Sequence, residues 1–311
     1  MRQLMRSLPL AAFACLFWTG GAAPAAKPVD CRDNAVGILR ASAPDGFAIY
    51  RQIADKPFLL HWIDCKDAQL GLPTAVHESV HFVTGEIDAF PLVDGGEIAR
   101  PHAVSQFFAP SLIAKKFKVD DFVATYLKPG RASSSSDFLY LLDELNAYTH
   151  DLNAAVDLKK MRRDDEYIDH RDGLAALMAF VALYVERARF SEPATWSGLQ
   201  KPEVAKTVAA LWGAAEKVMQ SSCGIPHFGT EDKTFIRQFC QANAQGALQT
   251  LIGRAPVCPN ECLNAEPEDA SVDETTNAAP DPSTRTLWSR RINRRASASN
   301  ASAPSQGAAS E

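Results

Sequence analysis

Two histidines four residues apart constrain this chain more than any other feature of its sequence. His77 and His81 flank Glu78 in the segment His-Glu-Ser-Val-His, and apolar residues surround it on both sides. Residues four apart lie on the same face of an α-helix, one turn from each other. The apolar flanks therefore predict a buried helix over 68–83, despite a proline at position 73. On such a helix both imidazoles can reach one cation.

The same spacing suits the chemistry of a metal-activated water molecule. Zinc binds imidazole nitrogens at about 2.0–2.1 Å, and a catalytic zinc site needs one further protein ligand and an open position. Zinc also lowers the pKa of a bound water molecule towards about 7. Glu78 can accept the proton of that water without being a ligand itself. The residues thus predict one Zn²⁺ ion held by His77 and His81, with Glu78 as the general base.

This segment resembles a known family. Residues 74–83, Thr-Ala-Val-His-Glu-Ser-Val-His-Phe-Val, are similar to the active-site helix of the zincin metallopeptidases. The metzincin continuation is absent, because Thr84 and Ile87 occupy the positions of its glycine and third histidine. The gluzincin subclass, in which a second helix further along the chain presents a glutamate to the metal, fits better.

A candidate for that second helix lies downstream. Residues 143–148, Asp-Glu-Leu-Asn-Ala-Tyr, follow an apolar run and resemble the gluzincin ligand helix. The resemblance implies Glu144 as the third zinc ligand, and Tyr148 as a group that orients a ligand or contacts the substrate oxyanion. However, 62 residues separate His81 from Glu144, which is longer than the family's patterns. The resemblance therefore covers two short helices and identifies no particular family.

Other residues of the same segment are alternatives for the third ligand. Asp143, His150 and Asp151 carry suitable donor atoms and lie within two turns of Glu144. Asp143 or Asp151 can instead accept a hydrogen bond from the second ring nitrogen of a ligand histidine. The sequence leaves this choice open.

The cysteines and the N-terminus together predict export. Residues 1–26 contain two arginines, an apolar stretch over 8–18 and an Ala-Pro-Ala site, the order of a cleaved signal peptide. Cleavage would remove Cys15 and leave six of the seven cysteines, an even number typical of disulfide-bonded exported proteins. Proximity along the chain favours the pairs Cys31–Cys65, Cys223–Cys240 and Cys258–Cys262. We expect a periplasmic or secreted protein with no transmembrane segment in the mature chain.

The remaining chain divides into a core and a tail. Hydrophobic periodicity continues to about residue 263, and the composition of 264–311 predicts a disordered, low-complexity tail. The core, 27–263, is expected to be a single zincin-like domain of mainly α (α+β) class with disulfides. Its small β portion is expected near the N-terminus, as a hairpin of 47–53 with 57–63, followed by an extended segment at 90–93 and a Gly-Gly turn. Helices are expected at 111–117, 120–127, 137–161, 171–190, 202–221, 233–242 and 246–253.

These observations predict an exported zinc metallopeptidase that hydrolyses peptide bonds in a peptide or protein substrate. The alternative is a non-catalytic exported module with a zincin fold that binds a peptide or an envelope partner. A third hypothesis is a helical protein held by disulfides, in which the motif is fortuitous. The net charge of −5 provides no basic field to collect nucleic acid, so we expect no nucleic-acid partner. The oligomeric state is left open.

Overall fold

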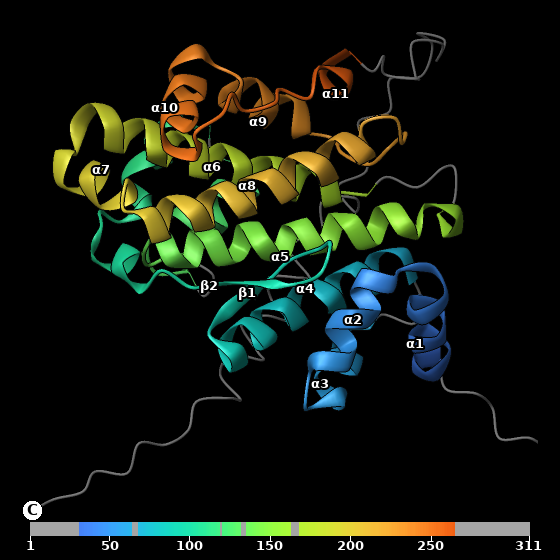
Figure 1. Cartoon of the computed structure of the whole chain (residues 1–311). Coiled ribbons are helices and arrows are strands. Elements are labelled where there is room, and N and C mark those ends of the chain that lie inside the picture. The colour runs from blue at the N-terminus through green and yellow to red at the C-terminus, as the bar shows by residue number, and fades with distance from the viewer. Residues whose placement is uncertain (1–30, 64–67, 119, 132–134, 163–167, 265–311) are drawn as a thin grey trace, which may run out of the picture.

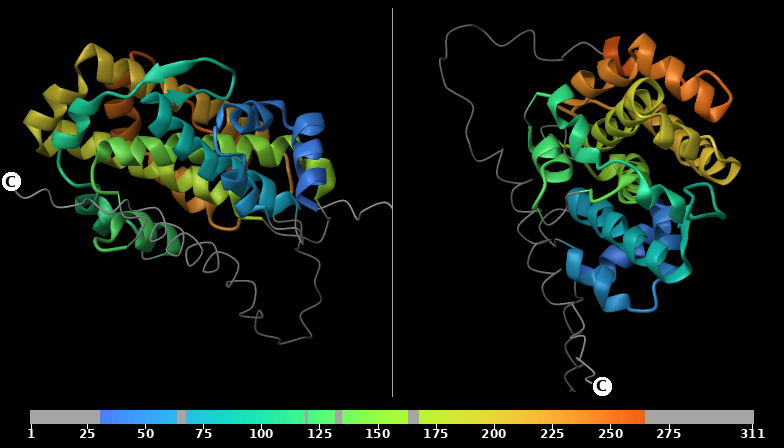
Figure 2. Two further views of the ribbon diagram at one scale, coloured as in Figure 1. Left: turned by 90° about the horizontal axis from the view of Figure 1, so that it is seen from below. Right: turned by 90° about the vertical axis from the view of Figure 1, so that its left-hand side faces the viewer.

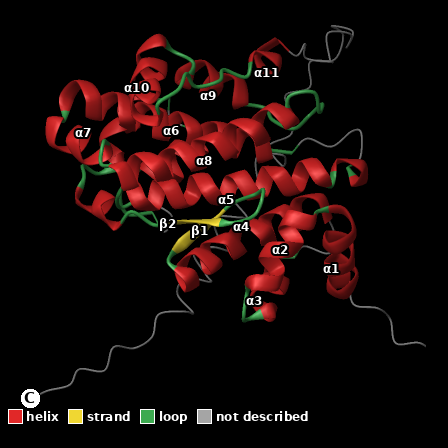
Figure 3. Cartoon of the chain, viewed as in Figure 1, coloured by secondary structure: helices red, strands yellow, loops and turns green. Residues whose placement is uncertain are grey.

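Helices make up most of the chain in the computed structural model, which describes residues 31–63, 68–118, 120–131, 135–162 and 168–264. Figure 3 shows these helices together with one short β-hairpin. The mainly helical class expected from the sequence is therefore confirmed. In chain order the elements are α1 (Cys31–Ser42), α2 (Pro44–Gln52), α3 (Lys56–Trp62), α4 (Ala68–Ile87), β1 (Ala89–Pro91), β2 (Glu97–Ala99), η1 (His102–Gln106), η2 (Pro110–Lys116), η3 (Val123–Leu127), α5 (Phe138–Asp157), η4 (Lys159–Met161), α6 (His170–Ser191), α7 (Pro193–Leu199), α8 (Pro202–Ser222), α9 (Asp232–Phe239), α10 (Ala242–Ile252) and α11 (Asn260–Asn264).

Helix α5 forms the centre of the arrangement. It packs against α4 on one side and against α6 and α8 on the other (Figure 1). The end-on view of Figure 2 shows the N-terminal helices below α5 and the C-terminal helices above it. Two hydrophobic clusters follow this division, and α5 contributes side chains to both of them. The interface between α4 and α5 therefore lies between the two halves of the core.

The sequence of α5 explains where this helix begins and why it is buried, but the helix also buries an unusual number of polar side chains. Asp137 caps the helix by accepting a hydrogen bond from the backbone N–H of Tyr140, and apolar residues follow on most sides. Polar side chains are nevertheless buried along its middle. They are Asp143, Glu144, Asn146, Thr149, His150 and Asp151, each at most 9% exposed. Because charged residues are almost never fully buried without partners, these residues indicate a site rather than ordinary core.

The hairpin expected from 47–53 and 57–63 is wrong, because these segments are the helices α2 and α3. Short apolar runs fit a helix as well as a strand, and here the buried residues Ile49 and Ile53 are one helical turn apart. A proline in the first turn of each helix also suits a helical start.

The β structure instead follows the histidine helix. Strand β1 pairs with β2 in antiparallel register, with Phe90 opposite Ile98. The turn between them contains Gly95 and Gly96 at φ of 87° and 83°, a conformation that favours glycine. The extended segment and its Gly-Gly turn are thus confirmed, and β1 packs against α4 and α5.

Two disulfides connect the C-terminal helices, but not in the expected pairs. Cys223 at the end of α8 is bonded to Cys262 in α11, and Cys240 is bonded to Cys258. The pairs Cys223–Cys240 and Cys258–Cys262 are therefore wrong. Proximity along the chain fails here because α11 packs against α8 and α9, so that one disulfide loop is nested within the other.

The disulfides also bear on the environment of the protein. Disulfides persist in oxidising compartments, so they indicate an exported protein. Cys31 is disulfide-bonded as well, whereas its expected partner Cys65 lies outside the described residues. The expected signal peptide at 1–26 and nearly all of the expected tail at 264–311 also lie outside them. Among the helices that the structure describes, none has the length and apolar character needed to cross a membrane.

Candidate metal centre

Three side chains expected to bind a metal converge at the interface of α4 and α5. His77 and His81 lie one turn apart on α4, and their Nε2 atoms are 3.2 Å from each other. Glu144 faces them from α5, with its Oε2 atom 3.6 Å from Nε2 of His77 and 3.5 Å from Nε2 of His81. Within the described part of the chain, these three residues form a group able to hold a metal ion.

The spacing of these three atoms matches one face of a tetrahedral site. With metal–ligand distances of about 2.0–2.1 Å, neighbouring ligands of a tetrahedral ion lie about 3.3 Å apart. The observed separations of 3.2, 3.5 and 3.6 Å are close to this value. Two imidazoles and one carboxylate are also a donor set that suits Zn²⁺ and several other divalent transition metals. The residues therefore fit a metal ion, without specifying which one.

The electrostatics of the group favour a positive charge. The Glu144 side chain is fully buried, and those of His77 and His81 are only 6% and 18% exposed. Burial by itself would lower the pKa of His81, but the carboxylates of Asp143 and Glu144 raise it to about 10. A cation at this position is thus stabilised by two nearby carboxylates.

Asp143 contacts the outer side of the same group. Nδ1 of His81 donates a hydrogen bond to Oδ2 of Asp143 over 2.7 Å. With the proton on Nδ1, Nε2 of His81 carries a lone pair, and this is the atom that faces Glu144. Asp143 is therefore placed as an acceptor for a ligand histidine, one of the two roles that the sequence left open for it.

The other two alternatives for the third ligand have different partners. Nε2 of His150 donates a hydrogen bond to the backbone carbonyl of Pro91 over 3.0 Å, which connects α5 to β1. Asp151 accepts a hydrogen bond from Nδ1 of His170, a fully buried histidine on α6. In the described structure neither belongs to the metal-binding group, so Glu144 is the acidic residue that faces both histidines.

The buried His150 predicts a pH-dependent stability. Burial, with a smaller contribution from nearby His77, lowers the pKa of His150 from 6.5 to about 4, despite the bond to Pro91. Between these pH values the unfolded chain binds a proton that the folded protein does not. The free energy of unfolding should therefore fall as the pH drops from 6.5 towards 4, by up to about 3 kcal/mol from this residue.

Replacement of His150 by glutamine tests this expectation. Glutamine keeps an N–H donor for the carbonyl of Pro91 but does not titrate, so His150→Gln should flatten the decline of stability below pH 6.5. Urea unfolding of the metal-free protein at several pH values measures the effect. His61→Gln, at an exposed position, is the matched control and should leave the slope unchanged. Identical pH profiles for His150→Gln and wild type would contradict the prediction.

Glu78 is next to His77 along α4, and Tyr148 contacts His77 from α5. The side chain of Glu78 is partly exposed. The ring of Tyr148, on α5, packs edge-on against the imidazole of His77 with 4.5 Å between ring centroids. Its hydroxyl is hydrogen-bonded to the hydroxyl of Tyr126 over 2.8 Å.

Tyr126 is a neighbour of the site that the sequence reasoning missed. It lies in η3, a short π-helical turn, where a segment over 120–127 was expected to form an ordinary helix. Turns of this type are rare in proteins as a whole, but many of them occur at functional sites. No sequence pattern predicts them. The signal that was available is the tyrosine itself, since a buried hydroxyl usually finds a partner.

Comparison of the chain with protein-family models, with curated proteins and with solved structures found no match. The metal-binding group is thus the feature from which a function can be argued.

Proposed function

We propose that this protein is an exported metal-dependent hydrolase, most simply a zinc metallopeptidase of gluzincin-like type. One observation carries the proposal. His77, His81 and Glu144 present three donor atoms at tetrahedral spacing, with His77 and Glu144 buried and His81 partly buried. Glu78, partly exposed, follows His77 on α4. A purely structural metal site would need a fourth protein ligand, whereas three ligands beside a carboxylate suit hydrolysis.

Each residue of the site has a role in this proposal. Zn²⁺, when bound, would polarise the substrate carbonyl and lower the pKa of a water molecule. Glu78 accepts the proton of the attacking water and delivers it to the amine that leaves. Asp143 keeps the Nδ1–H tautomer of His81, so that Nε2 carries a lone pair. Tyr148 supports the ring of His77 from the side of α5.

The class of substrate follows from the resemblance of residues 74–83 to the zincin helix. Peptides are the substrates implied by that resemblance, and the disulfides fit a protein that meets them outside the cytoplasm. The alternative, a non-catalytic module that binds a peptide through the same scaffold, would contain the metal without turnover. Metal content and hydrolysis must therefore be measured separately.

The experiment uses the purified full chain. We expect about one zinc ion per chain by elemental analysis, since three protein ligands define one site. We also expect cleavage of a mixed peptide library that stops on removal of the metal by 1,10-phenanthroline and returns when Zn²⁺ is added. His77→Ala should abolish both metal content and cleavage, whereas His102→Ala, at an exposed position, should change neither.

Absence of stoichiometric metal from the wild-type protein would overturn the proposal. Metal at full stoichiometry without cleavage of any peptide would instead support the non-catalytic module.

A further inference from the structure

Tyr148 is enclosed by three different elements of the fold. Its ring contacts His77 of α4 at an interplanar angle of 78°, and its hydroxyl is bonded to Tyr126 of the η3 turn. The third contact is with Gly173 in the first turn of α6. A β-carbon added at Gly173 would overlap Cε1 and Cδ1 of the tyrosine ring. The side chain is only 4% exposed, so these contacts define its position.

The two metal-binding histidines are oriented in different ways. His81 is fixed by a hydrogen bond from Nδ1 to the carboxylate of Asp143. The outward contact described for His77 is ring packing against Tyr148. An edge-to-face pair has a preferred geometry, so displacement of the tyrosine ring changes the angle at which the imidazole meets its neighbours. The orientation of His77 thus depends on where Tyr148 is held.

The backbone on the far side of Tyr148 is firmly anchored. Asp172, next to Gly173, accepts hydrogen bonds from the backbone N–H groups of Thr230 and Asp232, at 2.9 and 2.7 Å, at the start of α9. Burial and the nearby Asp232 raise the pKa of Asp172 to about 7, despite these hydrogen bonds. The first turn of α6 is therefore tied to α9.

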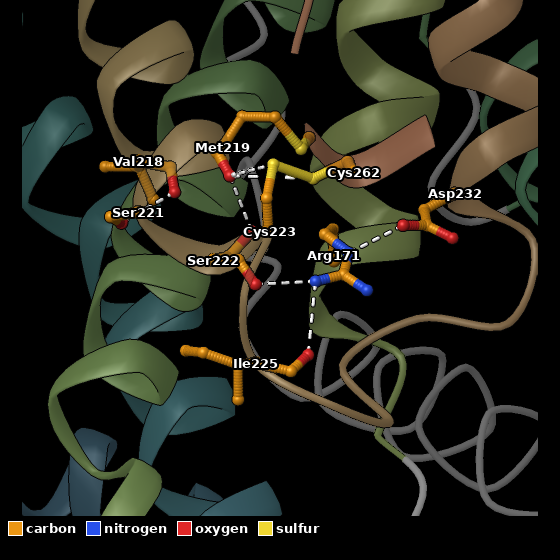
Figure 4. The surroundings of a disulfide bond; sticks show 9 residues. All are labelled: Arg171, Val218, Met219, Ser221, Ser222, Cys223, Ile225, Asp232 and Cys262. Carbon is orange, nitrogen blue, oxygen red and sulfur yellow. Dashed lines mark hydrogen bonds and ion pairs between the residues drawn. A yellow bond between two sulfur atoms is a disulfide. The ribbon is translucent and has the colours of Figure 1, made fainter. Parts of the chain in front are cut away.

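Arg171 ties the same turn to α8. Its guanidinium donates to Asp232 and to the backbone carbonyl of Ser222, both at 2.6 Å. Figure 4 shows that these partners lie beside the Cys223–Cys262 disulfide, which joins α8 to α11. Because α6 is held in this way, a larger residue at position 173 would displace the tyrosine ring more easily than the helix.

We propose that Gly173 and Tyr126 are positioning residues of the metal centre. They hold the ring of Tyr148 against His77 and thereby set the orientation of its imidazole. This inference rests on the metal-binding part of the proposed function and not on hydrolysis. Neither residue belongs to the metal-binding group, and each contacts Tyr148, so we expect their effect to pass through Tyr148.

The test compares two helical glycines by binding of Co²⁺ to the metal-free full chain. Gly173→Ala should weaken Co²⁺ binding about tenfold or more and shift the d–d absorption bands, as loss of support around a ligand does. Gly85→Ala is the matched control. It lies on α4 itself, the helix of both histidines, where an added β-carbon meets nothing within 4 Å. Both changes introduce a better helix former, so affinity should stay within about twofold for Gly85→Ala.

A double-mutant cycle separates positioning from a general structural effect. In a Tyr148→Ala background, Gly173→Ala should change Co²⁺ affinity less than about twofold, because the contact is gone. Tyr126→Phe, which removes only a hydroxyl, should shift the d–d bands in the same direction as Gly173→Ala, and it remains decisive if the alanine variant does not fold.

The inference is overturned if Gly173→Ala folds and keeps the wild-type affinity and spectrum, or if its effect persists in the Tyr148→Ala background. An unchanged spectrum of Tyr126→Phe would overturn it as well. Failure of the wild-type chain to bind Co²⁺ would overturn the proposed metal site together with this inference. Binding without any peptide cleavage would leave the positioning role intact and contradict only the hydrolase.

Discussion

Glu78→Gln should retain the metal and lose the hydrolytic activity. Glutamine has nearly the same size as glutamate but cannot accept a proton at the neutral pH at which the carboxylate does. Because positioned proton transfer contributes about 10²–10⁴-fold to the rate, we expect kcat to fall by that factor. The atoms proposed to bind the metal belong to His77, His81 and Glu144, so zinc content should remain at the wild-type level.

The matched control for this variant lies two turns along the same helix. Glu86 is exposed near the end of α4, and Glu86→Gln introduces the same chemical change away from the site. It should have wild-type activity and wild-type zinc content. Peptide cleavage and elemental analysis on the same preparations measure both quantities. Retained activity in Glu78→Gln would contradict the role of general base, and loss of its zinc would show that Glu78 binds the metal.

Local periodicity is the reason that two of the three candidate metal ligands could be predicted from the sequence. His77 and His81 are four residues apart within an apolar segment, and the helix that results places both on one face whatever the rest of the fold. Glu144 depends on a long-range contact between two helices. It was predicted through the resemblance to a ligand helix, and α5 does pack against α4. Neighbouring acidic residues could not be separated in this way.

The features that could not be predicted depend on tertiary contacts. The choice between Asp143 and Glu144 rests on which face of α5 meets α4, and adjacent residues differ in this by only part of a turn. The nested disulfides depend on how α11 returns to α8. In the sequence Gly173 is an ordinary helical glycine, and its contact with the ring of Tyr148 is evident only in the structure. The prediction of strands at α2 and α3 failed for a different reason. Their short apolar runs fit the periodicity of a strand as well as that of a helix.

Glu144→Gln should have the largest effect on metal binding of any single change in α5. The amide keeps the shape of the side chain but removes the negative charge that faces both imidazoles within 3.6 Å. We expect zinc affinity to fall about 10³-fold or more, because a ligand is lost from a site with three. Asp143→Asn changes the neighbouring carboxylate, which supports His81 without binding metal. Its expected loss is about 10–100-fold.

Thermal unfolding distinguishes the two variants without any assay of activity. A ligand at 1,000 times its Kd stabilises the folded state by about 4 kcal/mol, so wild-type protein should gain this much when zinc is added. At the same zinc concentration Asp143→Asn should keep about 1.4–2.7 kcal/mol of the gain, whereas Glu144→Gln should keep about 0.4 kcal/mol or less.

The metal-free variants provide a second comparison. Glu144→Gln removes a buried carboxylate that helps to raise the pKa of His81, so its metal-free form should unfold more easily than metal-free wild type. The gain in stability on adding zinc must therefore be measured against the metal-free form of the same variant, so that its loss in Glu144→Gln reflects the missing ligand and not the weaker fold. If Asp143→Asn loses the larger share of zinc affinity instead, the roles of the two carboxylates are the reverse of those proposed. Asp143, which contacts Nδ1 of His81, is then the metal ligand.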